Sequence, residues 1–254
     1  MSRSDPYPDC VSSDPLDPRN LVVEPYADFG TSEPWVARTM LGILEVAGAT
    51  RWSGDENLSN AVGSVFEALA EAFNDLRALR ELDAREKVPV TERDAAFSAF
   101  YRHLWTAYKD RFQNGVPPVL GYKIGFLFAS DRDFEAVAAK FLRKHPELDP
   151  AFVTMLGDER RSWQSALARF RNDHLEHRKK LDPLFVAPFY TLATAELAFE
   201  NVWQAIEDIT VQLLVPYLPP GISLVEIPEA HRDAGFPKRF GFRVPAVEQN
   251  REAS

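Results

Sequence analysis

The chain has few cysteines, few glycines and no long apolar run, and each shortage excludes a class of protein. Cys10 is the single cysteine among the 254 residues, which rules out an intrachain disulfide and a zinc site built on several cysteines. With only 12 glycines, the sequence contains no phosphate-binding loop, nucleophile elbow or dinucleotide fingerprint. The most apolar stretches, at 124–129 and 211–218, are too short to cross a bilayer, so no membrane partner is predicted.

The beginning of the chain and the overall charge narrow the class further. Residues 1–20 are rich in Asp, Ser and Pro and lack the apolar stretch of a secretory signal, so we expect a cytoplasmic protein. The net charge of −9 disfavours a generic nucleic-acid binder, because phosphate contacts need clustered Lys and Arg. A local basic site stays compatible with this charge.

What the sequence does contain is apolar surface in a helical pattern. Hydrophobic residues make up 45% of the chain, which is enough for a packed core. Apolar positions three and four residues apart, separated by prolines and glycines, predict helices at about 32–48, 58–80, 91–114, 130–145, 158–181 and 188–215. A turn is predicted at 150–156 and a strand at 222–227, while 116–128 fits a loop or a short strand equally well.

These elements predict an all-α fold, a single helical bundle of five to seven helices with irregular N- and C-terminal tails. Residues 1–31 contain repeated prolines, which prevent a continuous helix, so we expect a flexible or docked tail there. Residues 32–216 would form the bundle, and 217–254 would form an irregular C-terminal extension.

The helix predicted at 158–181 carries polar residues on its apolar side. On a wheel of about 100° per residue, His174 and His177 continue the apolar stripe, while Arg171 and Asp173 lie on its two flanks. The wheel therefore predicts that both histidines face the bundle or a partner. Each buried polar group without a hydrogen bond costs about 1–3 kcal/mol. The histidines are therefore either a satisfied core pair or part of a site.

The stretch 170–178, Phe-Arg-Asn-Asp-His-Leu-Glu-His-Arg, resembles the signature of HEPN-domain proteins. In that family a helix carries an Arg, usually followed by a polar residue, and a His about one to two turns later. Arg171, Asn172 and His177 fit this pattern, with five residues between the Arg and the His. The basic Arg178 directly after the His is similar to HEPN domains of the abortive-infection type.

The resemblance implies a metal-independent endoribonuclease toxin or phage-defence component that needs no cofactor and acts at a homodimer interface. Arg171 would stabilise charge on the scissile phosphate of RNA. His177 would act as general base or acid for attack by the ribose 2′-hydroxyl, since its pKa lies naturally near neutrality. Asn172 would orient the phosphate or hold the motif of the second copy. An antitoxin-like protein would be a further partner.

Four neighbouring residues complete the expected site. His174 and Asp173 are further catalytic candidates, and Arg178 and Lys179 would bind the substrate. Glu176 directly precedes His177, and its negative charge would oppose phosphate binding.

The geometry of an ideal helix is consistent with a dimer. Arg171 and His177 would be about 120° apart around the axis and about 9 Å apart along it, so one helix brings them together poorly. Two copies crossing at a two-fold axis could pair the Arg171 of one with the His177 of the other.

Two other functions stay open. The first is a non-catalytic module that binds a nucleotide or a protein, with the basic and aromatic segment 231–243 either as its contact surface or, as we favour, strapped over the bundle by its Phe side chains. The second is a metal-binding bundle in which His174, His177 and Asp173 take a further ligand from Glu196 or Glu200. The sequence lacks the Glu-x-x-His spacing typical of such bundles, so no metal ligand is assigned.

Overall fold

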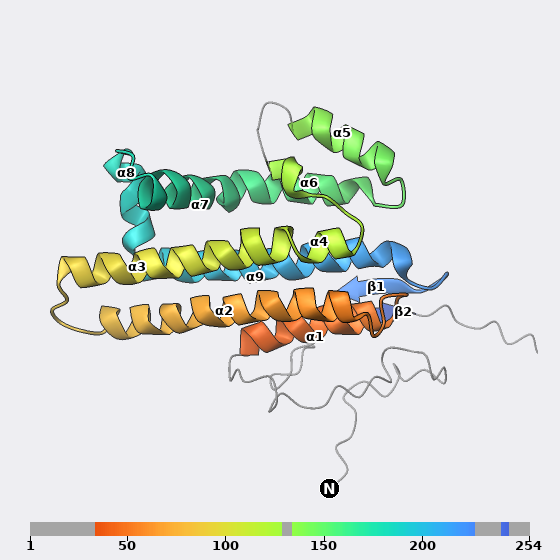
Figure 1. Cartoon of the computed structure of the whole chain (residues 1–254), viewed down its shortest axis with the longest axis horizontal. Coiled ribbons are helices and arrows are strands. Elements are labelled where there is room, and N and C mark those ends of the chain that lie inside the picture. The colour runs from red at the N-terminus through yellow and green to blue at the C-terminus, as the bar shows by residue number, and fades with distance from the viewer. Residues whose placement is uncertain (1–33, 129–133, 227–239, 244–254) are drawn as a thin grey trace, which may run out of the picture.

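The computed structural model describes residues 34–128, 134–226 and 240–243. These residues are mostly helical and include one small sheet, which confirms the predicted all-α bundle (Figure 1). The N-terminal tail expected at 1–31 lies outside the described residues. No described helix combines the length and the apolar character that crossing a membrane requires.

The first half of the chain forms an antiparallel hairpin of long helices together with a shorter first helix. The elements are α1 (Pro34–Gly48), α2 (Glu56–Asp83), α3 (Val90–Trp105), the wide-turned η4 (Thr106–Gln113), α4 (Val116–Val119) and η5 (Gly125–Phe128). Asp55 caps α2 because its carboxylate accepts a hydrogen bond from the Leu58 backbone N–H at 2.8 Å. Segment 116–128, for which a loop or a short strand was expected, contains no strand. It forms the two short helical turns α4 and η5, and Gly121 between them has a φ of 92°.

The second half contains two long helices and a small antiparallel sheet. Its elements are α5 (Phe134–Lys144), α6 (Pro150–Glu159), η6 (Arg160–Gln164), α7 (Ser165–Arg169), η7 (Phe170–Glu176), α8 (Pro183–Val186), η8 (Ala187–Tyr190), α9 (Leu192–Leu214), η9 (Val215–Tyr217), β1 (Ser223–Glu226) and β2 (Phe240–Arg243). The segments from α6 to η7 follow one another without a break and form one helix.

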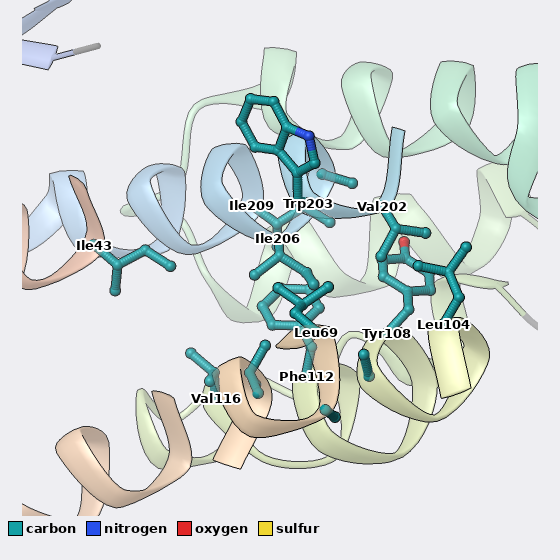
Figure 2. Close-up of a cluster of buried hydrophobic side chains, with 14 of the residues drawn as sticks. Ile43, Leu69, Leu104, Tyr108, Phe112, Val116, Val202, Trp203, Ile206 and Ile209 are labelled. Atoms are coloured by element: carbon teal, nitrogen blue, oxygen red, sulfur yellow. The ribbon is translucent and has the colours of Figure 1, made fainter. Parts of the chain in front are cut away.

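The core lies between α1, α2, α3 with η4, and α9, which run side by side (Figure 1). Figure 2 shows how it is filled: Leu69 of α2 and Leu104 of α3 meet Val202 and Ile206 of α9. Each of these four side chains is at most 1% exposed. The helix from α6 to η7 forms a further layer over α3 and α9 (Figure 1).

The helix predicted at 158–181 differs from the structure at both ends. It begins at Pro150, where the Asp149 carboxylate accepts from the Ala151 backbone N–H at 2.8 Å, so the predicted turn at 150–156 is its first part. It ends at Glu176, five residues earlier than predicted at 181. The prediction was wrong here because the polar run 176–180 supplies no apolar contact to prolong the helix, and the chain reverses at Arg178 with a φ of 49°.

The C-terminal extension contributes the sheet. Strand β1 lies within the strand predicted at 222–227 and pairs antiparallel with β2, with Leu224 opposite Phe242. Phe242 is 7% exposed and joins the core, which agrees with a tail held on the bundle by a Phe side chain. Of the basic and aromatic segment 231–243, only 240–243 belongs to the described residues.

Candidate functional site

The motif segment is held in place by two apolar anchors in η7. Phe170 is 0% exposed and stacks on Phe189 with ring centroids 4.1 Å apart and planes 5° apart. Tyr101 of α3 meets the same Phe170 ring edge-on at 5.1 Å. Leu175, also buried, fixes the other end of the segment. The polar residues between and after these anchors are thus carried on a rigid support.

The end of η7 places His177 in solvent. Its backbone N–H donates to the Asn172 carbonyl at 3.0 Å, a bond that spans five residues where an α-helix spans four. A π-helical turn of this kind contains more residues than an α-helical turn, so every later residue is rotated away from the position that a regular helical wheel gives it. His177 caps the helix and is exposed, as are 178–180. His177 therefore does not face the bundle, one of the two positions that the wheel predicted for it.

His174 behaves as a satisfied, half-buried histidine. Its Nε2 shares a hydrogen bond with the Tyr190 hydroxyl, 3.2 Å away, and its ring stacks on Phe170 at 5.2 Å. Burial raises the pKa of Tyr190, and the nearby Asp94 carboxylate raises it further. The Tyr190 hydroxyl therefore remains protonated at neutral pH. These contacts match the expectation of a core histidine for His174, and they separate it from the exposed His177.

Asn172 is the residue that joins the Arg and the His of the motif. Its side-chain Oδ1 accepts from Arg171 Nη1 at 3.0 Å, while its backbone carbonyl accepts from the His177 N–H at 3.0 Å. One residue thus fixes both the Arg171 guanidinium and the backbone of His177.

Two guanidinium groups converge on the Glu176 carboxylate. Arg102 Nε donates to Glu176 Oε1 at 2.9 Å, and Arg171 Nε lies 3.8 Å from the same oxygen. The Arg102 hydrogen bond, together with the charges of Arg171 and His177, holds the pKa of Glu176 below its usual value. Glu176, which the sequence identified as an unfavourable charge, is therefore surrounded by three basic groups.

The remaining predicted residues are Asp173, Arg178 and Lys179. Lys179 Nζ donates to Asp173 Oδ1 at 2.7 Å, and the Lys179 backbone N–H donates to the Asp173 carbonyl at 2.7 Å. The Lys179 hydrogen bond lowers the pKa of Asp173, which stays ionised near neutrality and unsuited to act as a general acid. Arg178 is exposed in the reversing turn. Asp173 therefore holds the end of η7 through its two contacts with Lys179.

Arg102 is the site residue that the sequence analysis missed. It lies on α3, 74 residues before Glu176, and its Nη2 also donates to the Leu175 carbonyl at 3.2 Å. No local spacing relates residues this far apart in the chain. Only the packing of α3 against η7 brings them together.

The metal-binding alternative finds no set of ligands in the part of the chain that the structure describes. Within 34–128, 134–226 and 240–243, no three His, Cys, Asp or Glu side chains gather. Glu196 instead forms an ion pair with Arg80 at 2.8 Å, and Glu200 accepts from Gln204 Nε2 at 3.3 Å. The two side chains that were alternatives for the further ligand thus have other partners.

No family model matches the chain, and neither a curated protein nor a solved structure matches it.

Proposed function

We propose that the chain is a HEPN-like, metal-independent endoribonuclease whose site lies at the end of η7 and works across a homodimer. The observation that carries the proposal is the double role of Asn172, which holds Arg171 through its side chain and His177 through its backbone. A fixed guanidinium and an exposed imidazole at the same helix end are the two kinds of group that phosphodiester cleavage needs.

The reaction divides between these side chains. The His177 imidazole takes the proton of the ribose 2′-hydroxyl, whose oxygen attacks the phosphorus and displaces the 5′-oxygen of the next nucleotide. The Arg171 guanidinium stabilises the charge that develops on the phosphate oxygens. The leaving 5′-oxygen takes a proton from a second imidazole, for which the His177 of the other copy is available in a dimer. The products are a 2′,3′-cyclic phosphate and a free 5′-hydroxyl.

The surface around His177 fits an anionic substrate and a protein partner. Residues 177–180, His-Arg-Lys-Lys, are all exposed and supply the local basic site that an acidic chain needs for RNA. Leu184 of α8 follows closely and is 84% exposed, a large apolar side chain suited to contact with a second copy or with an antitoxin-like protein. A cytoplasmic toxin or phage-defence component would use both features.

The test compares RNA cleavage by wild type, His177→Ala and His103→Ala in the presence of a chelator. His103 is a matched control because it is also a partly exposed histidine, hydrogen-bonded to Asp75 at 2.6 Å. We expect His177→Ala to lower the cleavage rate by about 100-fold or more, because a general base contributes about that much, while His103→Ala stays close to wild type. Equal rates in all three folded proteins would contradict the proposal. RNA binding without cleavage by wild type would favour the non-catalytic alternative.

A further inference from the structure

The two arginines at Glu176 are held in the same way. Each is anchored through one Nη: Arg102 Nη2 donates to the Leu175 carbonyl at 3.2 Å, and Arg171 Nη1 donates to Asn172 Oδ1 at 3.0 Å. The Nε of each lies within 4.0 Å of the same oxygen, Glu176 Oε1, at 2.9 Å for Arg102 and 3.8 Å for Arg171. Both guanidinium groups would therefore keep their positions if the carboxylate left.

The Glu176 carboxylate lies at different distances from the two guanidinium groups. Its Oε1 is 2.9 Å from Arg102 Nε, a normal hydrogen bond, but 3.8 Å from Arg171 Nε, which is too long for one. Arg171 Nε is buried from solvent and has no hydrogen-bond partner among the described residues. A buried donor without an acceptor is unfavourable, so the site as it stands lacks an oxygen at Arg171.

We propose that Arg102 and Arg171 form one binding site for a phosphodiester group, and that Glu176 occupies this site in the resting protein until the substrate displaces it. The inference rests on the proposed ribonuclease function, and it adds Arg102 as a second phosphate-binding residue and Glu176 as an internal competitor.

The chemistry of a phosphodiester fits the two donors better than Glu176 does. Its two non-bridging oxygens can accept separately from the two Nε groups, whereas Glu176 presents one oxygen to both. The backbone of Glu176 is fixed by η7, the helix that also carries Arg171, and from there its carboxylate comes within hydrogen-bond distance of only one of the two Nε groups. A ligand that arrives from solvent has no such restriction.

Displacement of Glu176 is favoured by its exposure. The Arg102 and Glu176 side chains are 47% and 35% exposed, and ion pairs with this much solvent contact contribute little to stability. The released carboxylate would be hydrated at the surface, beside the basic run 177–180, where incoming RNA is attracted. The occupied site therefore works as a weak, reversible block.

The test measures binding of inorganic phosphate to the full chain at neutral pH by isothermal titration calorimetry. We expect Glu176→Gln to bind phosphate about fivefold or more tightly than wild type, because the competing charge is gone. Adding Arg102→Gln to that variant should abolish the gain. Glu196→Gln is the matched control, since Glu196 also pairs with one partly exposed arginine, Arg80, at 2.8 Å, and its phosphate affinity should equal that of wild type.

A second arm separates a free phosphate site from a substrate site. A short RNA with 2′-O-methyl groups cannot be cleaved, and its affinity should rise in Glu176→Gln by at least as much as that of phosphate. A gain for inorganic phosphate alone would overturn the assignment to a phosphodiester. An unchanged affinity for both probes in Glu176→Gln, with thermal unfolding that shows a folded protein, would overturn the proposal as a whole.

These measurements do not depend on catalysis. A chain that cleaves no RNA but shows the Glu176→Gln gain has the anion site without the ribonuclease function. A chain that cleaves RNA through His177 but shows no gain has the function without this block. The two failures are therefore distinguishable.

Discussion

Two histidine–carboxylate clusters lie toward opposite ends of the bundle, and they differ in how completely their polar groups are satisfied. Near α4 and the end of α9, the His145 ring lies between Phe141 and Tyr122, at 4.7 and 4.9 Å, and its Nδ1 binds Glu147 at 3.2 Å. The Tyr122 hydroxyl donates to the Tyr217 hydroxyl at 3.1 Å. Every named group here has a partner within the chain.

The cluster at the end of η7 lies near α8 (Figure 1), and its polar groups are less completely satisfied. His177 is exposed, and Arg171 Nε is buried without an acceptor among the described residues. The same residue types thus serve two purposes. A closed set of contacts stabilises the fold, while an incomplete set in reach of solvent is suited to a ligand.

The largest expected effect is on the stability of the closed cluster, which is formed by His145, Tyr122 and Tyr217. Tyr122 is 1% exposed, so Tyr122→Ala should lower the free energy of unfolding by about 3–5 kcal/mol through the cavity that it leaves. His177→Ala should change it by less than about 0.5 kcal/mol, because an exposed side chain is removed. Urea unfolding followed by circular dichroism measures both. A large loss of stability in His177→Ala would contradict the contrast between the two clusters.

The next effect is on RNA cleavage by the open cluster, which contains Arg171 and His177 at the end of η7. Arg171→Ala should lower the cleavage rate by about 100- to 1,000-fold, the usual loss when one group that stabilises the developing oxyanion is removed. Arg161 is a matched control on the same helix, exposed and ion-paired with Asp158, and Arg161→Ala should cleave at the wild-type rate. Similar rates for both variants, measured with one labelled RNA, would remove Arg171 from the mechanism.

The smallest effect compares the two carboxylates as a function of pH. Burial alone would raise the pKa of Glu147, but hydrogen bonds from its own backbone N–H and from His145 outweigh this and lower it. A lowered pKa means stability that is present above the unfolded value of 4.5 and lost as the pH falls through the folded value.

Glu147→Gln should therefore cost less than about 1 kcal/mol at pH 7, because the carboxylate is partly exposed, and the cost should vanish in acid. The pKa of Glu176 is also lowered, so Glu176→Gln should show the same pH dependence in unfolding, but it alone should change phosphate affinity. Urea titrations at several pH values check this. A gain in phosphate affinity for Glu147→Gln would contradict the expectation that only the cluster at the end of η7 binds phosphate.

Much of the fold could be predicted from the sequence because long apolar stripes repeat with the helical period. Helices α2 and α9 lie within a few residues of the stretches predicted at 58–80 and 188–215. The end of the motif helix could not be predicted in this way. A wheel assumes one angle per residue, and the wide turns of η6 and η7 break that assumption without any change in composition.

Only the part of the candidate site that lies within one short segment could be predicted from the sequence. Arg171, Asn172 and His177 follow one another closely, so their association is a local pattern. Arg102 and Tyr190 reach the segment from other helices, and only tertiary packing reveals them. His145 contacts two residues close to it in the sequence, Phe141 and Glu147, and one distant residue, Tyr122, which only the fold brings to it.

The wide turn of η7 also sets how far apart the Arg and the His of the motif can be. In an α-helix a backbone N–H reaches the carbonyl four residues back, so a His five positions after the Arg would bond the residue that follows the Arg. Here the His lies six positions after Arg171, and the turn of η7, one residue wider, returns the His177 N–H to that same residue, Asn172. The extra residue in the spacing and the extra residue in the turn compensate each other. Deleting one residue between Asn172 and His177 should therefore turn this segment into a regular α-helix. In that helix the backbone N–H of the histidine would still donate to the Asn172 carbonyl.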